Sequence, residues 1–296
     1  MSNSPAANSQ HYYVPHGSAW PLVGSVGLVT LLAGFANWLH LKWFGPYLFF
    51  TGLLILLIMM FGWFGTVIRE NQQGLYNEQV DRTFRWAMGW FIFSEVLFFG
   101  AFFGAMFYAR WWAVPLLGGE YSHMIGTHLS LWPNFSFSWP LLSNPDNSQF
   151  TGAGGVIPAF GVPFLNTLIL LTSGATITWA HWALKLNKRK QLIGALALTV
   201  GLGIAFLFLQ AHEYIEAYED FNLTLESGIY GSTFFMLTGF HGAHVTVGTL
   251  ILIVVLLRCM AGHFSKHNHF AFEAAAWYWH FVDVVWLFLF VLVYWL

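Results

Sequence analysis

Seven apolar stretches of about 20 residues restrict what this chain can fold into more than any other feature. A helix rises about 1.5 Å per residue, so each stretch is long enough to cross the hydrocarbon core of a bilayer. Helices of this kind satisfy all their backbone hydrogen bonds within lipid. We therefore predict an all-α membrane protein with seven transmembrane helices, at residues 20–41, 46–67, 84–108, 162–186, 192–214, 228–257 and 273–296.

These helices divide the chain into six segments. They are a polar N-terminal tail (1–19), the first two transmembrane helices (20–67), an inner loop (68–83), the third helix (84–112), a long outer loop (113–159) and the last four helices (160–296). The outer loop is rich in Gly, Pro, Ser and Asn, which predicts an irregular cap. The tail contains no Lys or Arg, so it lacks the charged start of a signal peptide.

Positive charge predicts the orientation of the helices. Loops on the inner side of a membrane carry an excess of Lys and Arg. Only Lys42 and Arg110 fall on one side of the predicted helices. The other nine lie in the three loops opposite: Arg69, Arg82, Arg85, Lys185, Lys188, Arg189, Lys190, Arg258 and Lys266. We therefore expect the N-terminus inside and the C-terminus outside.

Composition excludes several classes of protein. Charged residues make up 8% of the chain, against about 25% in soluble domains. Cys259 is the single cysteine, which excludes an internal disulfide, a two-cysteine copper centre and an iron–sulfur cluster. No basic run indicates nucleic-acid binding.

Two carboxylates interrupt the apolar stretches. Glu95 has about ten apolar residues on each side, which places it near the bilayer centre. A charge there costs roughly 2.5 kcal/mol or more, and such residues usually face a bundle interior, a cavity or a partner. Asp283 follows His280 by three residues, so the two share a helix face. Both carboxylates are compatible with a functional role, such as a proton relay, and with hydrogen-bonded packing.

Histidines are the next candidates for chemistry. His241 and His244 share a helix face, but the sequence shows no histidine pair joined by a carboxylate at metal-ligand spacing. We therefore predict no metal site, and polar contacts between helices at His241, His244, Glu273 and His280. Axial haem ligation stays open as an alternative, with these candidate ligands: His40, His181, His212, His241, His244 and His280.

The predicted inner face could collect protons and bind lipid. Histidines titrate near neutral pH and can pass protons on; the candidates are His11, His16, His263, His267 and His269. Arg69, Arg258 and Lys266 could bind anionic lipid headgroups. On the outer side, residues 210–220 predict a solvated acidic rim, with a cation or docking site as the alternative. The step from Gly100 to Gly104 predicts close helix packing that turns Glu95 inward.

Three stretches resemble subunit III of haem–copper cytochrome c oxidases. They are Phe91-Ile-Phe-Ser-Glu95-Val-Leu-Phe-Phe99, the segment from Tyr230 to Val245 around His241-Gly-Ala-His244, and the segment from His269 to Trp286. The motifs Val67-Ile-Arg-Glu70 and Ile177-Thr-Trp-Ala-His181 add to the resemblance, which runs from the first helix to the C-terminus.

The resemblance implies an accessory subunit with no redox centre and no catalytic residue of its own. In the family, helices 1–2 and 3–7 form a V-shaped cleft that holds phospholipid, against the catalytic subunit I, which carries haem and copper. Subunit II completes the core of a complex that oxidises cytochrome c, reduces oxygen to water and pumps protons. Subunit III supports proton uptake and protects against turnover damage. The family's headgroup contacts carry over to Trp63, Glu70, Arg258 and His263.

Two departures from the family matter. Gly74-Leu75-Tyr76 stands where the family often has histidines. The loop 136–156 looks longer than in mitochondrial members, so we expect the inner membrane of a bacterium, with the mitochondrial inner membrane as the alternative. An independent proton or solute transporter using Glu95 and Asp283 is the competing function, and the absence of a visible internal repeat counts against it.

Overall fold

The structure is a computed structural model that describes residues 13–14, 17–121 and 125–296. The described residues contain no strand, and seven helices are long and apolar enough to cross a membrane. The prediction of an all-α protein with seven such helices is confirmed, whereas the orientation and the V-shaped cleft stay predictions. The helices are α1 (Trp20–Leu39), α2 (Gly45–Gln72), α3 (Glu78–Tyr108), α6 (Val162–Lys185), α7 (Arg189–Glu219), α8 (Ile229–Ala261) and α9 (Phe270–Leu289).

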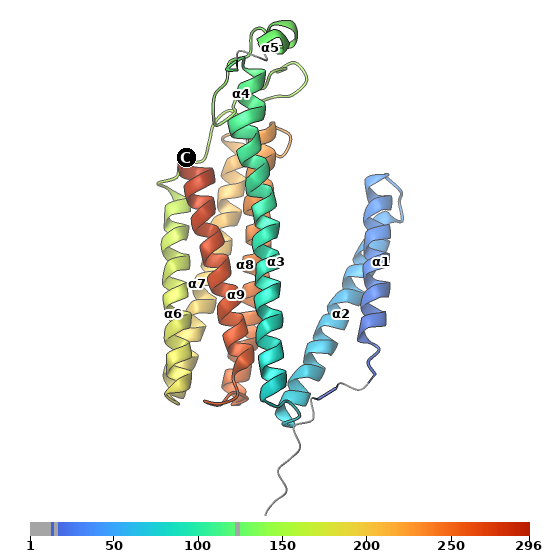
Figure 1. Ribbon diagram of the computed structural model, residues 1–296, viewed down its shortest axis with the longest axis vertical. Coiled ribbons are helices and arrows are strands. Elements are labelled where there is room, and N and C mark those ends of the chain that lie inside the picture. The colour runs from blue at the N-terminus through green and yellow to red at the C-terminus, as the bar shows by residue number, and fades with distance from the viewer. Residues whose placement is uncertain (1–12, 15–16, 122–124) are drawn as a thin grey trace, which may run out of the picture. The chain divides into compact units, whose positions relative to one another are not determined.

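The chain forms two compact units, and the first ends at Trp86. Its core is the hairpin of α1 and α2 (Figure 1). A Cβ added to Gly34 would lie 2.2 Å from the backbone nitrogen of Phe49, and one added to Gly52 would lie 2.3 Å from that of Leu31. The two backbones therefore touch, which only glycine permits at these positions.

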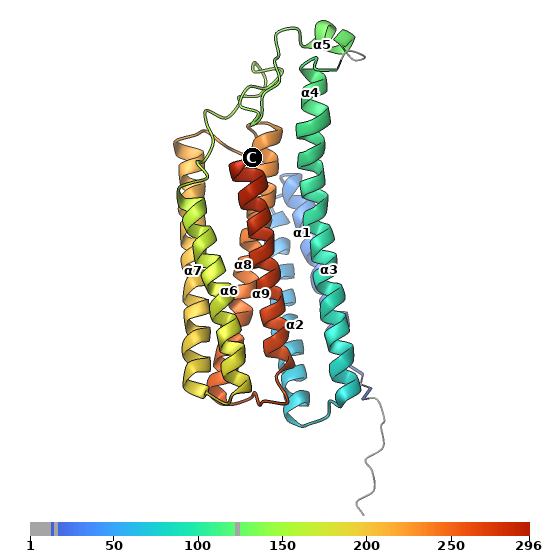
Figure 2. The same ribbon diagram turned by 60° about the vertical axis from the view of Figure 1, so that its left-hand side comes forward.

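The second unit begins at Ala87, and α6, α7, α8 and α9 lie side by side in it (Figures 1 and 2). Two fully buried indoles join α9 to α6. Trp279 donates to the hydroxyl of Ser173 and Trp286 to that of Thr167, each over 2.9 Å. Because both indole N–H groups have acceptors, these large side chains can fill the apolar core without an unsatisfied donor.

Aromatic side chains attach α3 to α8 and α9. The ring of Phe98 lies 5.0 Å from that of Phe240, and the ring of Phe99 lies 6.1 Å from that of Phe281. Gly100 and Gly104 are exposed, and a Cβ added to either would meet no described atom within 4 Å. The prediction that this glycine step packs against a neighbouring helix is therefore wrong within the described residues of the second unit.

Several helices extend beyond their apolar stretches. Helix α2 continues to Gln72 and α3 begins at Glu78, so the predicted inner loop 68–83 shrinks to 73–77. The side chain of Asn77 accepts a hydrogen bond from the backbone N–H of Val80 over 3.0 Å, as a helix cap does. At its other end α3 continues through a π-helical turn, η1 (Ala109–Ala113), into α4 (Val114–Leu117), past the predicted boundary at 112.

The segment that follows is irregular apart from α5 (Ile125–Leu131). Asn144 ties it to the α7–α8 connection by donating to the carbonyl oxygens of Phe150 and Ser227 over 3.2 and 3.3 Å. Gly228 lies so close that an added Cβ would be 2.3 Å from the side-chain oxygen of Asn144. At the C-terminal end, α9 continues into the π-helical turn η3 (Phe290–Trp295).

Candidate functional site

Glu95 of α3 and His244 of α8 form a hydrogen-bonded pair within the membrane-spanning helices. His244 Nε2 lies 2.9 Å from Glu95 Oε2, and His244 Nδ1 lies 2.6 Å from the carbonyl oxygen of Phe240. A carbonyl oxygen only accepts, so Nδ1 carries a hydrogen, and the bond between Nε2 and Oε2 needs a second one on either atom. The pair therefore holds one proton that either residue can carry.

Aromatic rings enclose this pair. The His244 ring lies 5.0 Å from that of Phe99 and 6.3 Å from that of Tyr278, measured between centroids. The side chains of His244 and Glu95 are 16% and 21% exposed. A low-polarity surrounding strengthens a hydrogen bond between such groups. Both residues were candidates in the sequence, but their pairing was not predicted, because they lie 149 residues apart.

His280 and Asp283 lie together on α9, as their spacing predicts. His280 Nδ1 is 3.6 Å from Asp283 Oδ2, and His280 Nε2 is 3.3 Å from the hydroxyl of Thr178 on α6. The Asp283 side chain is 9% exposed and that of His280 is 45% exposed. Gly174 makes room for the pair, since a Cβ there would lie 2.5 Å from Asp283 Oδ2.

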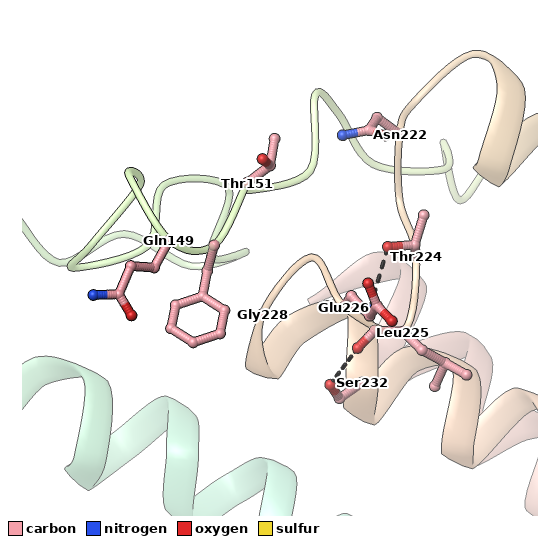
Figure 3. A pocket seen from close by; sticks show the side chains of 9 residues that line it. Gln149, Thr151, Asn222, Thr224, Leu225, Glu226, Gly228 and Ser232 are labelled. Atoms are coloured by element: carbon pink, nitrogen blue, oxygen red, sulfur yellow. Dashed lines mark hydrogen bonds between the residues drawn. The ribbon is translucent and has the colours of Figure 1, made fainter. Parts of the chain in front are cut away.

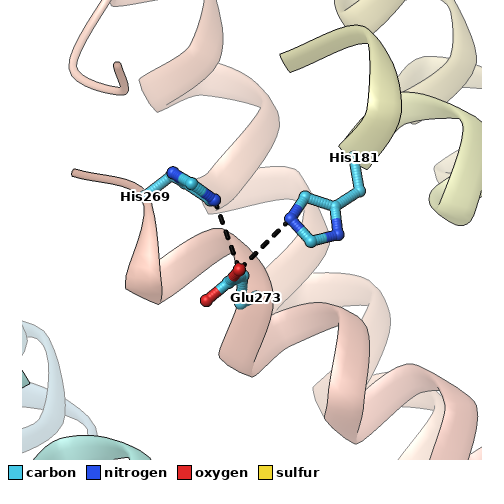
Figure 4. Close-up of side chains that lie close together, drawn as sticks. All are labelled: His181, His269 and Glu273. Atoms are coloured by element: carbon cyan, nitrogen blue, oxygen red, sulfur yellow. Dashed lines mark ion pairs between the residues drawn. The ribbon is translucent and has the colours of Figure 1, made fainter. Parts of the chain in front are cut away.

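A second cluster joins α6 to the start of α9. Figure 4 shows His181 and His269 converging on one carboxylate oxygen of Glu273, at 3.4 and 3.2 Å. Their ligand atoms lie within 4.8 Å of one another, so by residue type and spacing this group could hold a metal ion. The sequence reasoning missed it. His269 and Glu273 share a helix face at i, i+4, but His181 lies far away in the chain.

His241 is not part of either cluster. Its side chain is fully buried, and Nε2 lies 3.2 Å from the carbonyl oxygen of Val282 on α9. Because that carbonyl can only accept, Nε2 is the donor. The structure thus places His241 as a contact between α8 and α9, while His244, three residues later, faces Glu95.

The predicted inner face holds a buried arginine. The guanidinium of Arg258 lies 4.4 Å from the ring centroid of Phe264, and no described carboxylate lies within ion-pair distance of it. His263 and His267 are exposed, whereas His269 is buried in the cluster with Glu273. His11 and His16 lie outside the described residues.

The first unit carries the other three predicted lipid contacts. Trp63 and Arg69 are exposed, and Arg69 bonds the Thr66 hydroxyl over 3.2 Å. The hydroxyl of Tyr76 donates to Glu70 over 2.7 Å. Burial and this bond raise the pKa of Tyr76 above its ordinary value. Tyr76 thus engages Glu70 at the place where the family often has histidine.

Glu213 was predicted to belong to a solvated acidic rim, and this is wrong. The residue is fully buried. It accepts hydrogen bonds from the Tyr294 hydroxyl over 2.5 Å and from the Gln210 amide over 3.4 Å. Tyr294 sits in the last turn of the described chain, so no local pattern in residues 210–220 could reveal this partner.

An open pocket lies between the segment that follows α5 and the α7–α8 connection (Figure 3), with a volume of about 700 Å³. Glu226 is the one charged residue in its lining. The Thr224 hydroxyl accepts from the Glu226 backbone and the Ser232 hydroxyl donates to Leu225. These hydrogen bonds therefore stabilise the turn before α8. The described lining of the pocket does not bring reactive side chains together.

Together these features define a polytopic helical membrane protein with an acid–base pair among its membrane-spanning helices. A family model described as cytochrome c oxidase subunit III matches residues 10–142 and 149–296. The chain therefore belongs to the cytochrome c oxidase subunit III family, as the sequence resemblance predicts.

Curated relatives agree over nearly the full length. Cytochrome c oxidase subunit 3 of Formosania lacustris is 44% identical over 291 residues, covering 98% of each chain. The protein of the same name from Drosophila melanogaster is 44% identical over 296 residues, again covering 98% of each. That of Tachyglossus aculeatus aculeatus is 44% identical over 285 residues, 96% of each.

Proposed function

We propose that this chain is the non-redox subunit III of a proton-pumping haem–copper cytochrome c oxidase in aerobic respiratory electron transport. In this role it stabilises the catalytic subunit I, beside subunit II, in a complex that oxidises cytochrome c and reduces oxygen to water. It also supports proton uptake and protects the complex from inactivation during turnover. Haem and copper belong to the partner subunits.

The pair of Glu95 and His244 is the observation that carries this proposal. It holds a proton among apolar helices and so suits a chain that supports proton transfer in a neighbour. A transporter acting alone would also use Glu95, together with Asp283. The family to which the chain belongs favours the accessory role.

Phospholipid binding is the second part of the proposal. Arg258 is 8% exposed yet has no described carboxylate as a partner, and a lipid phosphate would supply the missing negative charge. His263 is exposed five residues later. Trp63, Arg69 and Glu70 complete the proposed set of contacts with lipid headgroups.

We place the complex in the bacterial inner membrane, with the mitochondrial inner membrane as the alternative. The family model leaves out residues 143–148, inside the loop that looks longer than in mitochondrial members. The curated relatives, which include insect and other animal proteins, leave the alternative open.

The first experiment purifies the tagged chain in mild detergent. Reduced-minus-oxidised spectra are recorded before and after the chain is stripped from its partners. Haem bands in the complex and none in the stripped chain are the expected result. Haem retained by the stripped chain would contradict the non-redox role, and no haem in either sample would favour the transporter.

The lipid part is tested by native mass spectrometry of the complex. Arg258→Ala should lower phospholipid occupancy, while Arg258→Lys keeps the charge and should retain more of it. Lys190→Ala, which removes an exposed cation of α7, serves as the control. Full occupancy in Arg258→Ala would count against this contact.

The protective role is tested by turnover. An oxidase stripped of the chain should begin at near-normal activity and then lose it during turnover, and adding the chain back should restore stability. Equal stability of both preparations would refute the role.

A further inference from the structure

His181, His269 and Glu273 form a compact group between α6 and the start of α9 (Figure 4). His269 and Glu273 lie four residues apart on one helix face, and α6 brings His181 against them. The three side chains are 20%, 10% and 12% exposed, so the group is largely withdrawn from solvent. It is separate from the pair of Glu95 and His244, and the proposed function makes no use of it.

The hydrogen bonding of His269 leaves a lone pair on the nitrogen that faces this group. His269 Nδ1 lies 3.1 Å from the carbonyl oxygen of Ser265. Because a carbonyl only accepts, Nδ1 carries the hydrogen of the neutral ring and Nε2 carries a lone pair. That lone pair faces Oε1 of Glu273, which is itself an acceptor. A backbone carbonyl on the far nitrogen is also what orients the ring of many metal-ligating histidines.

The distances within the group fit a metal ion better than a shared proton. A charge-assisted N–H···O bond is about 2.7–2.9 Å long. Oε1 of Glu273 lies 3.4 Å from His181 Nε2 and 3.2 Å from His269 Nε2, and both nitrogens are buried without a hydrogen bond to any described residue. Zinc–ligand bonds of about 2.0–2.2 Å at tetrahedral angles would separate neighbouring ligand atoms by roughly 3.3–3.5 Å. The observed distances lie close to this range.

The surroundings and the ligand types favour zinc. The ring of His181 lies 5.6 Å from that of Phe272, which is 1% exposed, so one side of the group is apolar. Attraction between a divalent cation and a carboxylate is strong in such surroundings. Two imidazole nitrogens with one carboxylate oxygen suit zinc, whereas Mg²⁺ and Ca²⁺ take oxygen ligands. Three protein ligands leave a fourth tetrahedral position for a water molecule.

We propose that His181 Nε2, His269 Nε2 and Glu273 Oε1 bind one zinc ion, which joins α6 to the start of α9. The spacing of residues along the sequence predicts no metal site, because His181 reaches the other two ligands only when α6 packs against α9. Zinc has no redox chemistry of its own. The site therefore goes beyond the proposed function without depending on it.

Zinc binding to the full chain tests the site. The chain is purified in mild detergent with a tag that contains no histidine, dialysed against zinc chloride and assayed for bound metal. Wild type should retain one equivalent. His181→Gln keeps a donor and an acceptor but loses the imidazole, and should weaken zinc binding by more than the roughly 10- to 100-fold that loss of an outer partner causes. Equal binding in this variant and wild type would overturn the proposal.

His267→Ala is the matched control, because it removes an exposed histidine outside the group and should bind zinc as wild type does.

X-ray absorption at the zinc edge identifies the ligands. Wild type should show nitrogen and oxygen neighbours at about 2.0–2.2 Å, with the scattering pattern of imidazole. His181→Cys replaces one zinc ligand by another and should add a sulfur neighbour at about 2.3 Å. A zinc spectrum of this variant without sulfur would place the ion elsewhere and overturn the site.

Thermal unfolding separates zinc from a shared proton. A ligand that binds only the folded chain raises the unfolding midpoint. Zinc should therefore raise the midpoint of wild type, and Mg²⁺ at the same concentration should not. The rise should be absent in His181→Gln. An unchanged wild-type midpoint in zinc would show that a proton holds the group together, and the proposed oxidase role would stand regardless.

Discussion

At the scale of single residues, the pair of Glu95 and His244 shows how a carboxylate is accommodated deep among apolar helices. The Phe240 carbonyl fixes the ring through Nδ1, which leaves Nε2 aimed at the carboxylate. Neither residue needs a full charge without a partner, since one proton serves both. The aromatic rings around them lower the local polarity, which strengthens the bond.

Removing one member of this pair should lower the free energy of unfolding more than replacing both members by apolar side chains. His244→Phe strands the Glu95 carboxyl and should lower the free energy of unfolding by about 1–3 kcal/mol. Glu95→Gln keeps a side chain that can donate to Nε2, so its effect should be smaller. Denaturation in mild detergent measures both. The coupling between His244→Phe and Glu95→Leu, each of which removes the bond, should be about 0.6–1.7 kcal/mol.

Ser94→Ala is the control for these variants, because Ser94 is exposed and donates only to the Phe91 carbonyl of its own helix. Additive effects of His244→Phe and Glu95→Leu would show that the pair contributes no interaction energy.

Tyr76 offers a test of pH dependence at the same scale. Burial and the bond to Glu70 raise the pKa of its hydroxyl. The bond is therefore present at pH values below about 10, the ordinary tyrosine value, and is lost only as pH rises through the higher folded value. Tyr76→Phe should lower unfolding free energy by about 0.5–1.5 kcal/mol, equally at pH 7 and pH 9.

Thermal unfolding at the two pH values measures this effect. Tyr47→Phe, at an exposed tyrosine of the same unit, is the control and should have little effect. A deficit in Tyr76→Phe that vanished by pH 9 would contradict the raised pKa.

At the scale of elements, the helices themselves were predictable and their contacts were not. An apolar stretch of about 20 residues is a local signal, and it located all seven long helices. Their ends were missed where polar residues such as Arg69 and Glu78 continue the helix outside the apolar window. The side of each helix that packs against its neighbours was not predicted, because apolar residues surround the whole helix and hydropathy does not distinguish one side from another.

In the candidate site too, single residues were predictable and the contacts between them were not. Glu95 stood out because a carboxylate in an apolar stretch is a signal in one dimension. His181 and Glu213 did not, because their partners, Glu273 and Tyr294, come from distant parts of the chain. The contacts between residues of different helices depend on how each helix is rotated about its axis. That rotation cannot be recognised in a single sequence.

The contact between α1 and α2 supplies a prediction for this scale. Gly34→Ala inserts a methyl where the backbone of α2 already lies, so the hairpin must separate, at a cost of about 1–3 kcal/mol. Gly65→Ala is the matched control in the same hairpin, since a Cβ there meets no described atom within 4 Å. Thermal unfolding compares them, and equal midpoints would show that the hairpin adapts to the methyl freely.

At the scale of the whole molecule, orientation is the prediction that follows from charge. Cys259 is only 3% exposed, so cysteines introduced at exposed positions should react first. Lys190→Cys should react with an impermeant maleimide only after the membrane is opened, and Gln149→Cys should react in sealed cells. The reverse pattern would show that the chain is inserted the other way round.

The two indole–hydroxyl bonds between α9 and α6 also bear on how such a chain can change over generations. Replacing Ser173 by a residue without a hydroxyl leaves the N–H of Trp279 without an acceptor, and replacing Trp279 by a smaller residue leaves a cavity. Thr167 and Trp286 stand in the same relation. The two positions of each bond therefore depend on one another. Tolerated substitutions should be inherited in pairs, and variants with only one of the two substitutions should be rare. Random libraries of the four positions, selected for respiration, should recover correlated doubles far more often than either single change.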